Sequence, residues 1–164
     1  MIHWRTGDLF ASDADALVDP VNCLGASGAG LAKAFRQRFP LTERVYQEAC
    51  RQGRLRPGTI LVEDVHDRLP ASPVRTIVFF PTKDDWRRPG RLEWVDQGLA
   101  VLAARLADGP DGIRRIAVPA LGCDLAGLAW ADVRPLVAAR LGTIPDVEVL
   151  AYEPLPGRAR RPVR

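Results

Sequence analysis

The sequence has no long apolar run and few of the residues that cross-link small proteins or bind metals. None of its 164 residues belongs to a run that approaches the roughly 18 apolar residues of a membrane-spanning helix. The chain starts without an apolar leader, so we expect a protein that is not exported. Its three cysteines are an odd number, widely spaced and without a CxxC pair. A disulfide framework and a zinc site are therefore disfavoured, and we expect a cytoplasmic protein without a metal.

Lysine is nearly absent, with two residues against 21 arginines, so the position of each lysine is informative. The net charge of +3 comes from the end of the chain, where residues 155–164 hold four arginines and no acid. A basic DNA-binding face therefore cannot be inferred from net charge alone. We expect one domain over residues 1–153 and a disordered arginine- and proline-rich tail over 154–164.

The apolar pattern alternates between strands and helices. Short β-prone segments end at Val21, Phe80, Val118 and Tyr152, and helical patterns separate them, the longest over 91–107. Such alternation is typical of an α/β fold with a mostly parallel sheet covered on both faces. Because ligands of such sheets bind beyond the carboxyl ends of the strands, the loops after the first three segments are candidate sites.

Two consecutive helices are predicted after the first of these strands. One covers 28–39, with Pro40 beyond its end, and the other covers 42–53, with Thr42 as N-cap and Gly53 as C-cap.

Glycines mark two of the three candidate loops. The loop over 22–31 follows a strand and opens a helix, where free backbone N–H groups favour a phosphate. It is neither a Walker loop nor the GxGxxG fingerprint. The loop over 119–128 has the same character, so the two loops could hold a diphosphate from two sides. The alternative is that both are ordinary strand-to-helix turns.

The remaining candidate loop contains Lys83. A lysine at this place could attack a sugar C1, stabilise a leaving group or pair with a phosphate, although most lysines are solvated surface groups. Asp8 follows the first strand and could accept from an adenine amino group or cap a turn. Cys23 and Cys123 have no nearby histidine in the sequence and are read as small packing residues.

Taken in order, these segments resemble the macrodomain family of ADP-ribose-binding modules. The matching pieces span residues 1 to about 153 and include segments 7–9, 16–22, 28–32, 116–122 and the last strand. Further segments, such as Phe80 to Lys83, are similar to two branches of the family. These are the DarG antitoxin macrodomains, which act on thymidine in single-stranded DNA, and the human terminal ADP-ribose protein glycohydrolase, which acts on acidic side chains. The resemblance implies a three-layer α/β/α macrodomain with a mixed, mostly parallel central sheet.

The resemblance also implies roles for individual residues. Lys83 matches the lysine on which hydrolysis depends in both branches. Asp8 would hold the adenine amino group, Asn22 would contact the distal ribose, and Tyr152 would lie near the adenine or the proximal ribose. The full set expected to bind ADP-ribose is Asp8, Leu9, Asn22, Gly28, Ala29, Gly30, Leu31, Pro119, Leu121, Gly122, Cys123, Asp124, Leu125 and Tyr152.

Two positions depart from the pattern. The human relative has a catalytic aspartate where this chain has Ala126, whereas Asp124 stands where both relatives carry glycine. The first difference weakens a mechanism in which that carboxylate resolves a lysine adduct, and it places the chain nearer the antitoxin type. Asp124 also puts a negative charge beside the proposed diphosphate, which it should repel unless its side chain turns away.

We therefore expect an ADP-ribosyl glycohydrolase that uses no cofactor and removes ADP-ribose from thymidine in single-stranded DNA, from acidic side chains of proteins, or from both. One alternative is a reader that binds ADP-ribose without cleaving it, because the binding motifs are more complete than the catalytic ones. A third reading is a phosphatase that acts on ADP-ribose 1″-phosphate, an activity of some macrodomains. Expected partners are ADP-ribosylated DNA or protein and a DNA ADP-ribosyltransferase, with no membrane. We expect a stand-alone monomer, and the arginine- and alanine-rich composition suggests an actinobacterium such as a streptomycete.

Contact with DNA is a separate hypothesis. Trp86, Arg87 and Arg91 follow Lys83 closely, with Arg88 between them. An aromatic residue among arginines could stack on a base and hold backbone phosphates. The alternative is a solvated loop that leads into a helix.

Overall fold

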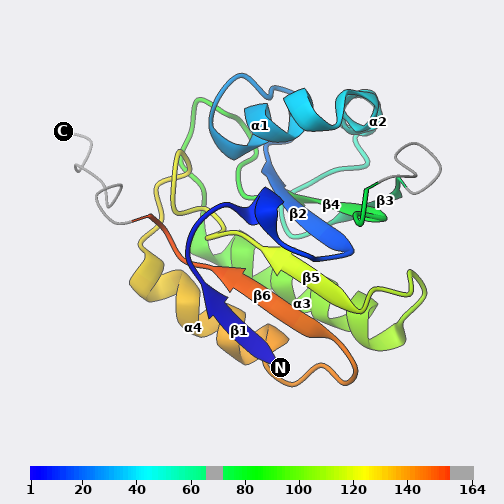
Figure 1. Cartoon of the computed structure of the whole chain (residues 1–164). Coiled ribbons are helices and arrows are strands. Elements are labelled where there is room, and N and C mark those ends of the chain that lie inside the picture. The colour runs from blue at the N-terminus through cyan, green and yellow to red at the C-terminus, as the bar shows by residue number, and fades with distance from the viewer. Residues whose placement is uncertain (66–71, 156–164) are drawn as a thin grey trace.

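A six-stranded sheet lies between two pairs of helices in the computed structural model, which describes residues 1–65 and 72–155 (Figure 1). The strands are β1 (Ile2–Arg5), β2 (Ala16–Val21), β3 (Leu61–Asp64), β4 (Thr76–Pro81), β5 (Arg115–Val118) and β6 (Glu148–Tyr152). The helices are the short 3-10 helix η1 (Leu9–Ala11), α1 (Gly30–Arg38), α2 (Pro40–Arg51), α3 (Leu92–Asp108) and α4 (Trp130–Leu141). The predicted three-layer α/β/α architecture is confirmed.

The strands follow the order β1-β6-β5-β2-β4-β3. All neighbours are parallel except β3, which pairs antiparallel with β4 at one edge. The sheet is therefore mixed and mostly parallel, as predicted. Of the predicted tail over 154–164, the residues from 156 on lie outside the described part of the chain.

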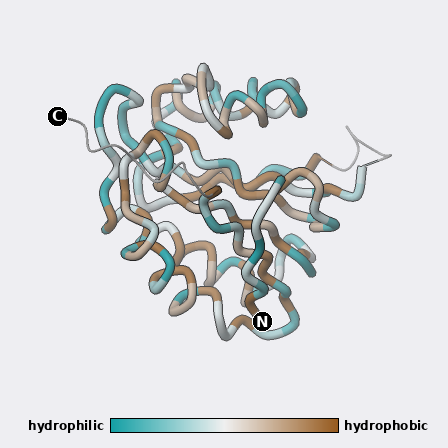
Figure 2. Tube along the Cα trace, turned by 60° about the vertical axis from the view of Figure 1, so that its left-hand side comes forward, coloured by the Kyte–Doolittle hydropathy of each residue, from teal (hydrophilic) through white to brown (hydrophobic). Residues whose placement is uncertain are grey.

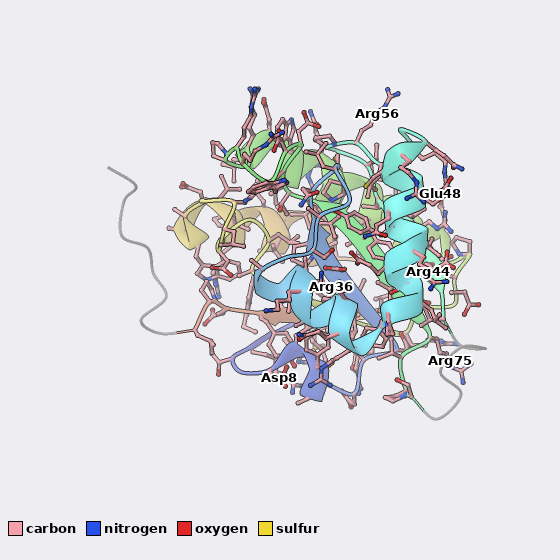
Figure 3. The ribbon with its side chains drawn as sticks, turned by 90° about the horizontal axis from the view of Figure 1, so that it is seen from above. Asp8, Arg36, Arg44, Glu48, Arg56 and Arg75 are labelled. Carbon is pink, nitrogen blue, oxygen red and sulfur yellow. The ribbon has the colours of Figure 1, made fainter. Side chains whose placement is uncertain are left out.

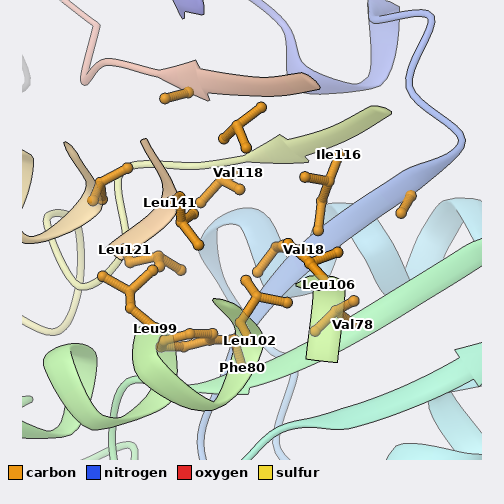
Figure 4. Packing of buried hydrophobic residues seen from close by; sticks show 14 of the residues in the cluster. Val18, Val78, Phe80, Leu99, Leu102, Leu106, Ile116, Val118, Leu121 and Leu141 are labelled. Carbon is orange, nitrogen blue, oxygen red and sulfur yellow. The ribbon is translucent and has the colours of Figure 1, made fainter. Parts of the chain in front are cut away.

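Alternating side chains of the strands build two separate cores. Val18 and Phe80 point to the face covered by α3 and α4, whereas Leu17 and Phe79 point to the face covered by α1 and α2. Figure 4 shows the first core, where Phe80 lies against α3. Gly98 permits that approach, because a Cβ atom there would lie 2.5 Å from the ring of Phe80. The hydrophobic segments accordingly run through the middle of the molecule in Figure 2.

The second predicted helix begins earlier than its sequence pattern indicates. Pro40 lies beyond the end of α1, as predicted, and is also the first residue of α2, because its missing N–H costs nothing at that position. Thr42 lies inside α2, where its hydroxyl donates to the Phe39 carbonyl at 2.8 Å. The helix ends at Arg51, and Gly53 follows with φ of +66°. Figure 3 shows charged side chains such as Arg44 on the outer face of this layer.

The topology places the candidate loops together. β2 and β5 are neighbours, yet the chain leaves β2 for α1 on one face and leaves β5 for α4 on the other. Two diverging connections leave room between them at the carboxyl edge of the sheet, which is where open α/β sheets bind ligands. The β4–α3 connection leaves from the same edge, and the three loops gather on the left of Figure 1.

Candidate functional site

Backbone hydrogen bonds join the three predicted loops into one site. The Cys23 N–H of the β2–α1 loop donates to the Asp84 carbonyl of the β4–α3 loop at 3.1 Å. The Gly90 N–H of the β4–α3 loop donates to the Ala126 carbonyl of the β5–α4 loop at 2.8 Å. The β4–α3 loop, which carries Lys83, is therefore bonded to both glycine-rich loops.

Asn22 shapes the β2–α1 loop from inside. Its amide nitrogen donates to the Ala26 carbonyl at 2.8 Å, and its side-chain oxygen accepts from the Leu24 N–H at 3.0 Å and from the Tyr46 hydroxyl at 3.0 Å. The residue is only 7% exposed. Both polar atoms of its side chain are thus engaged within the protein, and a contact of Asn22 with the distal ribose stays a prediction.

The start of α1 has the features of an anion site. Its N-cap, Ala29, is extended and offers no side-chain cap, so the first backbone N–H groups of the helix lack that partner. Gly30 has φ of +61°, a conformation that favours glycine. A Cβ atom on Gly28 would meet no heavy atom within 4 Å, so this side of the loop is open. Unpartnered N–H groups at a positive helix end favour a phosphate.

The β5–α4 loop closes on itself and lies against the start of α1. The Leu128 N–H donates to the Gly122 carbonyl at 2.8 Å, and Gly122 has φ of +73°. A Cβ atom on Gly30 would lie 3.2 Å from Leu125 Cδ1 and 3.4 Å from Asp124 Oδ2. The exposed Asp124 carboxylate therefore stays beside the site predicted for a diphosphate. The neighbouring loop residues Pro119, Leu121 and Cys123 are buried.

Lys83 is half-buried on the β4–α3 loop, which is bonded to both other loops. Its ammonium nitrogen donates to the Trp86 carbonyl at 3.2 Å. Burial lowers the pKa of Lys83 from its ordinary value, because a charged group loses solvation, and the Asp124 carboxylate opposes this by raising the pKa. Burial and the Asp124 carboxylate therefore shift the pKa of Lys83 in opposite directions.

We expect Asp124→Asn to lower the pKa of Lys83 further, because the variant removes the nearby negative charge and leaves the burial. Lysine side chains labelled with ¹³C at Cε report this pKa directly by NMR titration. The chain has only two lysines, so the exposed Lys33 serves as an internal reference. Asp108→Asn, at the far end of α3, is the matched control and should leave both titrations unchanged. An unchanged Lys83 titration in Asp124→Asn would contradict the coupling.

The cysteines of the site are not activated. Burial raises the pKa of the Cys23 thiol to about 12, and the Asp84 carboxylate adds to the rise. Burial likewise raises the pKa of the Cys123 thiol to about 12. Both residues are neutral thiols near neutral pH, which supports their interpretation as packing residues. Within residues 1–65 and 72–155, no three His, Cys, Asp or Glu side chains group as metal ligands.

The residues predicted around the adenine lie at the same edge of the sheet. Asp8 is the N-cap of η1, and its Oδ1 accepts from the Phe10 N–H at 2.9 Å. Leu9 and Tyr152 are buried in the core below α1 and α2, with 5% and 7% of their surface exposed. Asp8 is thus a turn cap here, and the adenine contacts of Asp8 and Tyr152 stay predictions.

Two of the arginines predicted to contact DNA, Arg87 and Arg91, are already paired with acids. The Arg87 guanidinium donates to both carboxylate oxygens of Asp85, at 2.9 and 2.6 Å. Arg91 donates to Glu93 at 3.4 Å and lies 5.1 Å above the ring of Trp94.

Two buried acids below the β2–α1 loop have no signal in the sequence. Asp19 lies inside β2, is 1% exposed, and its Oδ1 has no hydrogen-bond partner among the described residues. Burial raises the pKa of Asp19 well above its usual range, and nearby Glu43 adds to the rise. Burying a carboxylate costs free energy, and the raised pKa of both acids favours their neutral forms.

Comparisons with known proteins agree with this geometry. Residues 18–137 match the family model for the Macro domain. The DNA ADP-ribosyl glycohydrolase of Thermus aquaticus is 37% identical over 155 residues, which make up 94% of this chain and 42% of that protein. The chain spans about two fifths of the length of these curated relatives.

Solved structures show the same similarity. The macrodomain of Mycobacterium tuberculosis DarG is 35% identical, with a TM-score of 0.88 and coverage of 94% of this chain and 99% of that one. Thermosipho africanus DarTG in complex with ADP-ribose is 31% identical, with a TM-score of 0.87 and coverage of 96% and 42%. No helix in the described ranges has the length and apolar character needed to cross a bilayer. On its sequence, its fold and the arrangement of its loops, the chain belongs to the Macro domain family.

Proposed function

We propose that this chain is an ADP-ribosyl glycohydrolase that removes ADP-ribose from thymidine in single-stranded DNA. The observation that carries the proposal is the position of Lys83, on a loop bonded to both glycine-rich loops. The named activity of the Thermus relative and the ADP-ribose in the Thermosipho structure support it.

The diphosphate of ADP-ribose would bind between the β2–α1 and β5–α4 loops. The uncapped start of α1 supplies N–H donors and the positive end of a helix dipole. Gly28, Ala29 and Gly30 are exposed there, and their small size lets the ligand approach the backbone. Asp124 lies beside the same donors, so its carboxylate must move aside or share them when a diphosphate binds.

Binding of this kind would place the distal ribose near Lys83. In the proposed reaction the bond from the ribose C1 to the base nitrogen breaks, and its electron pair goes to the nitrogen. A water oxygen bonds to C1 and releases a proton, and the base nitrogen gains one. A protonated Lys83 stabilises the negative charge that develops on the base. The Trp86 carbonyl, which accepts from its ammonium group, and the Asp124 carboxylate both favour the charged form.

A DNA ADP-ribosyltransferase is the partner this activity requires, because another enzyme must attach the group that this one removes. One relative, from Thermosipho africanus, is named as a fusion of a DNA ADP-ribosyl transferase with a DNA ADP-ribosyl glycohydrolase. We propose that the chain acts on the product of such a transferase and needs no cofactor.

The test is release of free ADP-ribose from a thymidine-ADP-ribosylated single-stranded oligonucleotide. We expect catalytic turnover at substoichiometric enzyme. A parallel reaction with protein that carries ADP-ribose on glutamate shows whether the linkage matters. Binding of ADP-ribose without release from either substrate would replace the hydrolase with a reader, and release only from protein would overturn the DNA specificity.

A further inference from the structure

Each of the three loops of the site exposes one large apolar side chain. Leu24 is 53% exposed, Trp86 is 55% exposed and Leu125 is 57% exposed. A tryptophan that is more than half exposed offers a large apolar surface to a ligand or partner. Among the three, Trp86 lies closest to the chemistry, because its own carbonyl accepts from the Lys83 ammonium at 3.2 Å.

The turn that carries Trp86 is held in place. Asp85 Oδ1 accepts from the Arg87 N–H at 2.9 Å, and the Asp85 carbonyl accepts from the Arg88 N–H at 3.0 Å. The Arg87 guanidinium, fixed by both oxygens of Asp85, lies 5.7 Å from the centre of the Trp86 ring. The indole is therefore presented by a preorganised turn, which lowers the entropic cost of binding.

We propose that Trp86 is a stacking platform for a nucleobase of the single strand, and that it selects DNA-linked over carboxylate-linked ADP-ribose. This inference rests on the proposed function. A flat indole matches the face of any base, whereas the side chain of an ADP-ribosylated glutamate has no planar ring to stack. Because the Trp86 carbonyl accepts from the Lys83 ammonium, a base bound here lies next to the bond to be cleaved.

Stacking, and not phosphate contact, should dominate the binding. The guanidinium groups of Arg87 and Arg91 are paired with Asp85 and Glu93, so they are poorly placed to neutralise phosphates. Each phosphate neutralised on a single strand adds about −0.7 to the slope of log affinity against log salt. We therefore expect a slope no steeper than that of about one or two phosphate contacts.

The test compares Trp86→Ala, Trp86→Phe and a matched control, Leu41→Ala, which removes an apolar side chain that is 53% exposed, close to the 55% of Trp86, but lies on α2. Binding of an unmodified single-stranded oligonucleotide is measured by fluorescence anisotropy at several salt concentrations. Stacking is worth about 1–3 kcal/mol per base, so Trp86→Ala should weaken binding by about fivefold or more. Trp86→Phe should retain most of the affinity, and Leu41→Ala should behave as the unchanged protein.

Hydrolysis supplies the second measurement. Trp86→Ala should lower kcat/KM on an ADP-ribosylated oligonucleotide by a similar factor and leave release from glutamate-linked protein unchanged. An equal loss on ADP-ribosylated thymidine alone assigns the stacking to the modified base, and a loss confined to the oligonucleotide assigns it to a neighbouring base. Either result supports the platform.

Two results would overturn it. One is unchanged DNA binding in Trp86→Ala, and the other is a salt slope that corresponds to three or more phosphates. Because DNA binding is measured without turnover, a protein that binds through Trp86 but hydrolyses nothing would refute the proposed function and leave the platform standing.

Discussion

Replacing Lys83 with alanine should lower the rate of ADP-ribose release at least about a hundredfold, while affinity for free ADP-ribose stays within a few fold. A positioned group that stabilises charge in the transition state commonly contributes on the order of 100-fold to 1000-fold in rate. The diphosphate, in contrast, is expected to be held by backbone groups of the glycine-rich loops. Single-turnover hydrolysis of the thymidine-linked oligonucleotide and isothermal titration with ADP-ribose separate the two quantities.

The second lysine provides the control. Lys33 is exposed on α1, and Lys33→Ala removes the same functional group from a position outside the three loops. It should leave turnover unchanged. Among the described residues, the Lys83 side chain donates one hydrogen bond, to the Trp86 carbonyl at 3.2 Å, and otherwise interacts with the exposed Asp124 carboxylate, so Lys83→Ala should fold normally. Full activity in Lys83→Ala would remove this residue from the mechanism.

The charge state of Lys83 should make the rate of ADP-ribose release depend on pH. Burial lowers the pKa of Lys83, so the ammonium form is lost at a lower pH than for an exposed lysine. If the ammonium stabilises the leaving group, activity falls on the alkaline side as this pKa is passed. Removing the Asp124 charge lowers the pKa further and should shift that fall to lower pH.

The location of the site could be predicted from the sequence because it follows from topology. Apolar strand segments that end at Val21, Phe80 and Val118 predict parallel strands, and loops at their carboxyl ends meet at one edge. The structure places the three loops in mutual contact there. β2 ends at Val21 as predicted, because an apolar β-prone run closed by a polar residue leaves little freedom for its end.

Long-range contacts could not be predicted. The hydroxyl of Tyr46 reaches Asn22 from α2, 24 residues away, and holds the side chain for which a contact with the distal ribose is predicted. Asp19 lies in a strand whose apolar pattern indicates a core, and nothing local shows that its carboxyl is buried beside Glu43. The pairing of Arg87 with Asp85 likewise depends on how the turn closes and not on composition.

Gly28 offers the sharpest test of where the diphosphate binds. Its backbone is not in the left-handed region, and a Cβ atom there would meet no heavy atom within 4 Å. Gly28→Leu should therefore fold with an almost unchanged melting temperature. The added side chain would occupy the open space above the start of α1, where the ligand is expected to accept from backbone N–H groups. Hydrogen bonds to a charged group are worth about 1.5–3 kcal/mol each, so losing one should weaken ADP-ribose binding by roughly tenfold to 150-fold.

Two substitutions of different size at Gly28 show whether the added side chain itself weakens ADP-ribose binding. Gly28→Ala adds one carbon and should weaken ADP-ribose binding less than Gly28→Leu, because only the larger side chain reaches over the helix start. Ala104→Leu, at an exposed position of α3 near the opposite edge of the sheet, adds a leucine of the same size outside the site and should leave affinity unchanged. Calorimetric titration and thermal unfolding of all three variants give affinity and stability independently. Unchanged ADP-ribose affinity in Gly28→Leu would show that the diphosphate does not approach the β2–α1 loop, since no folded conformation of that loop could accommodate both the leucine and the ligand at the same place.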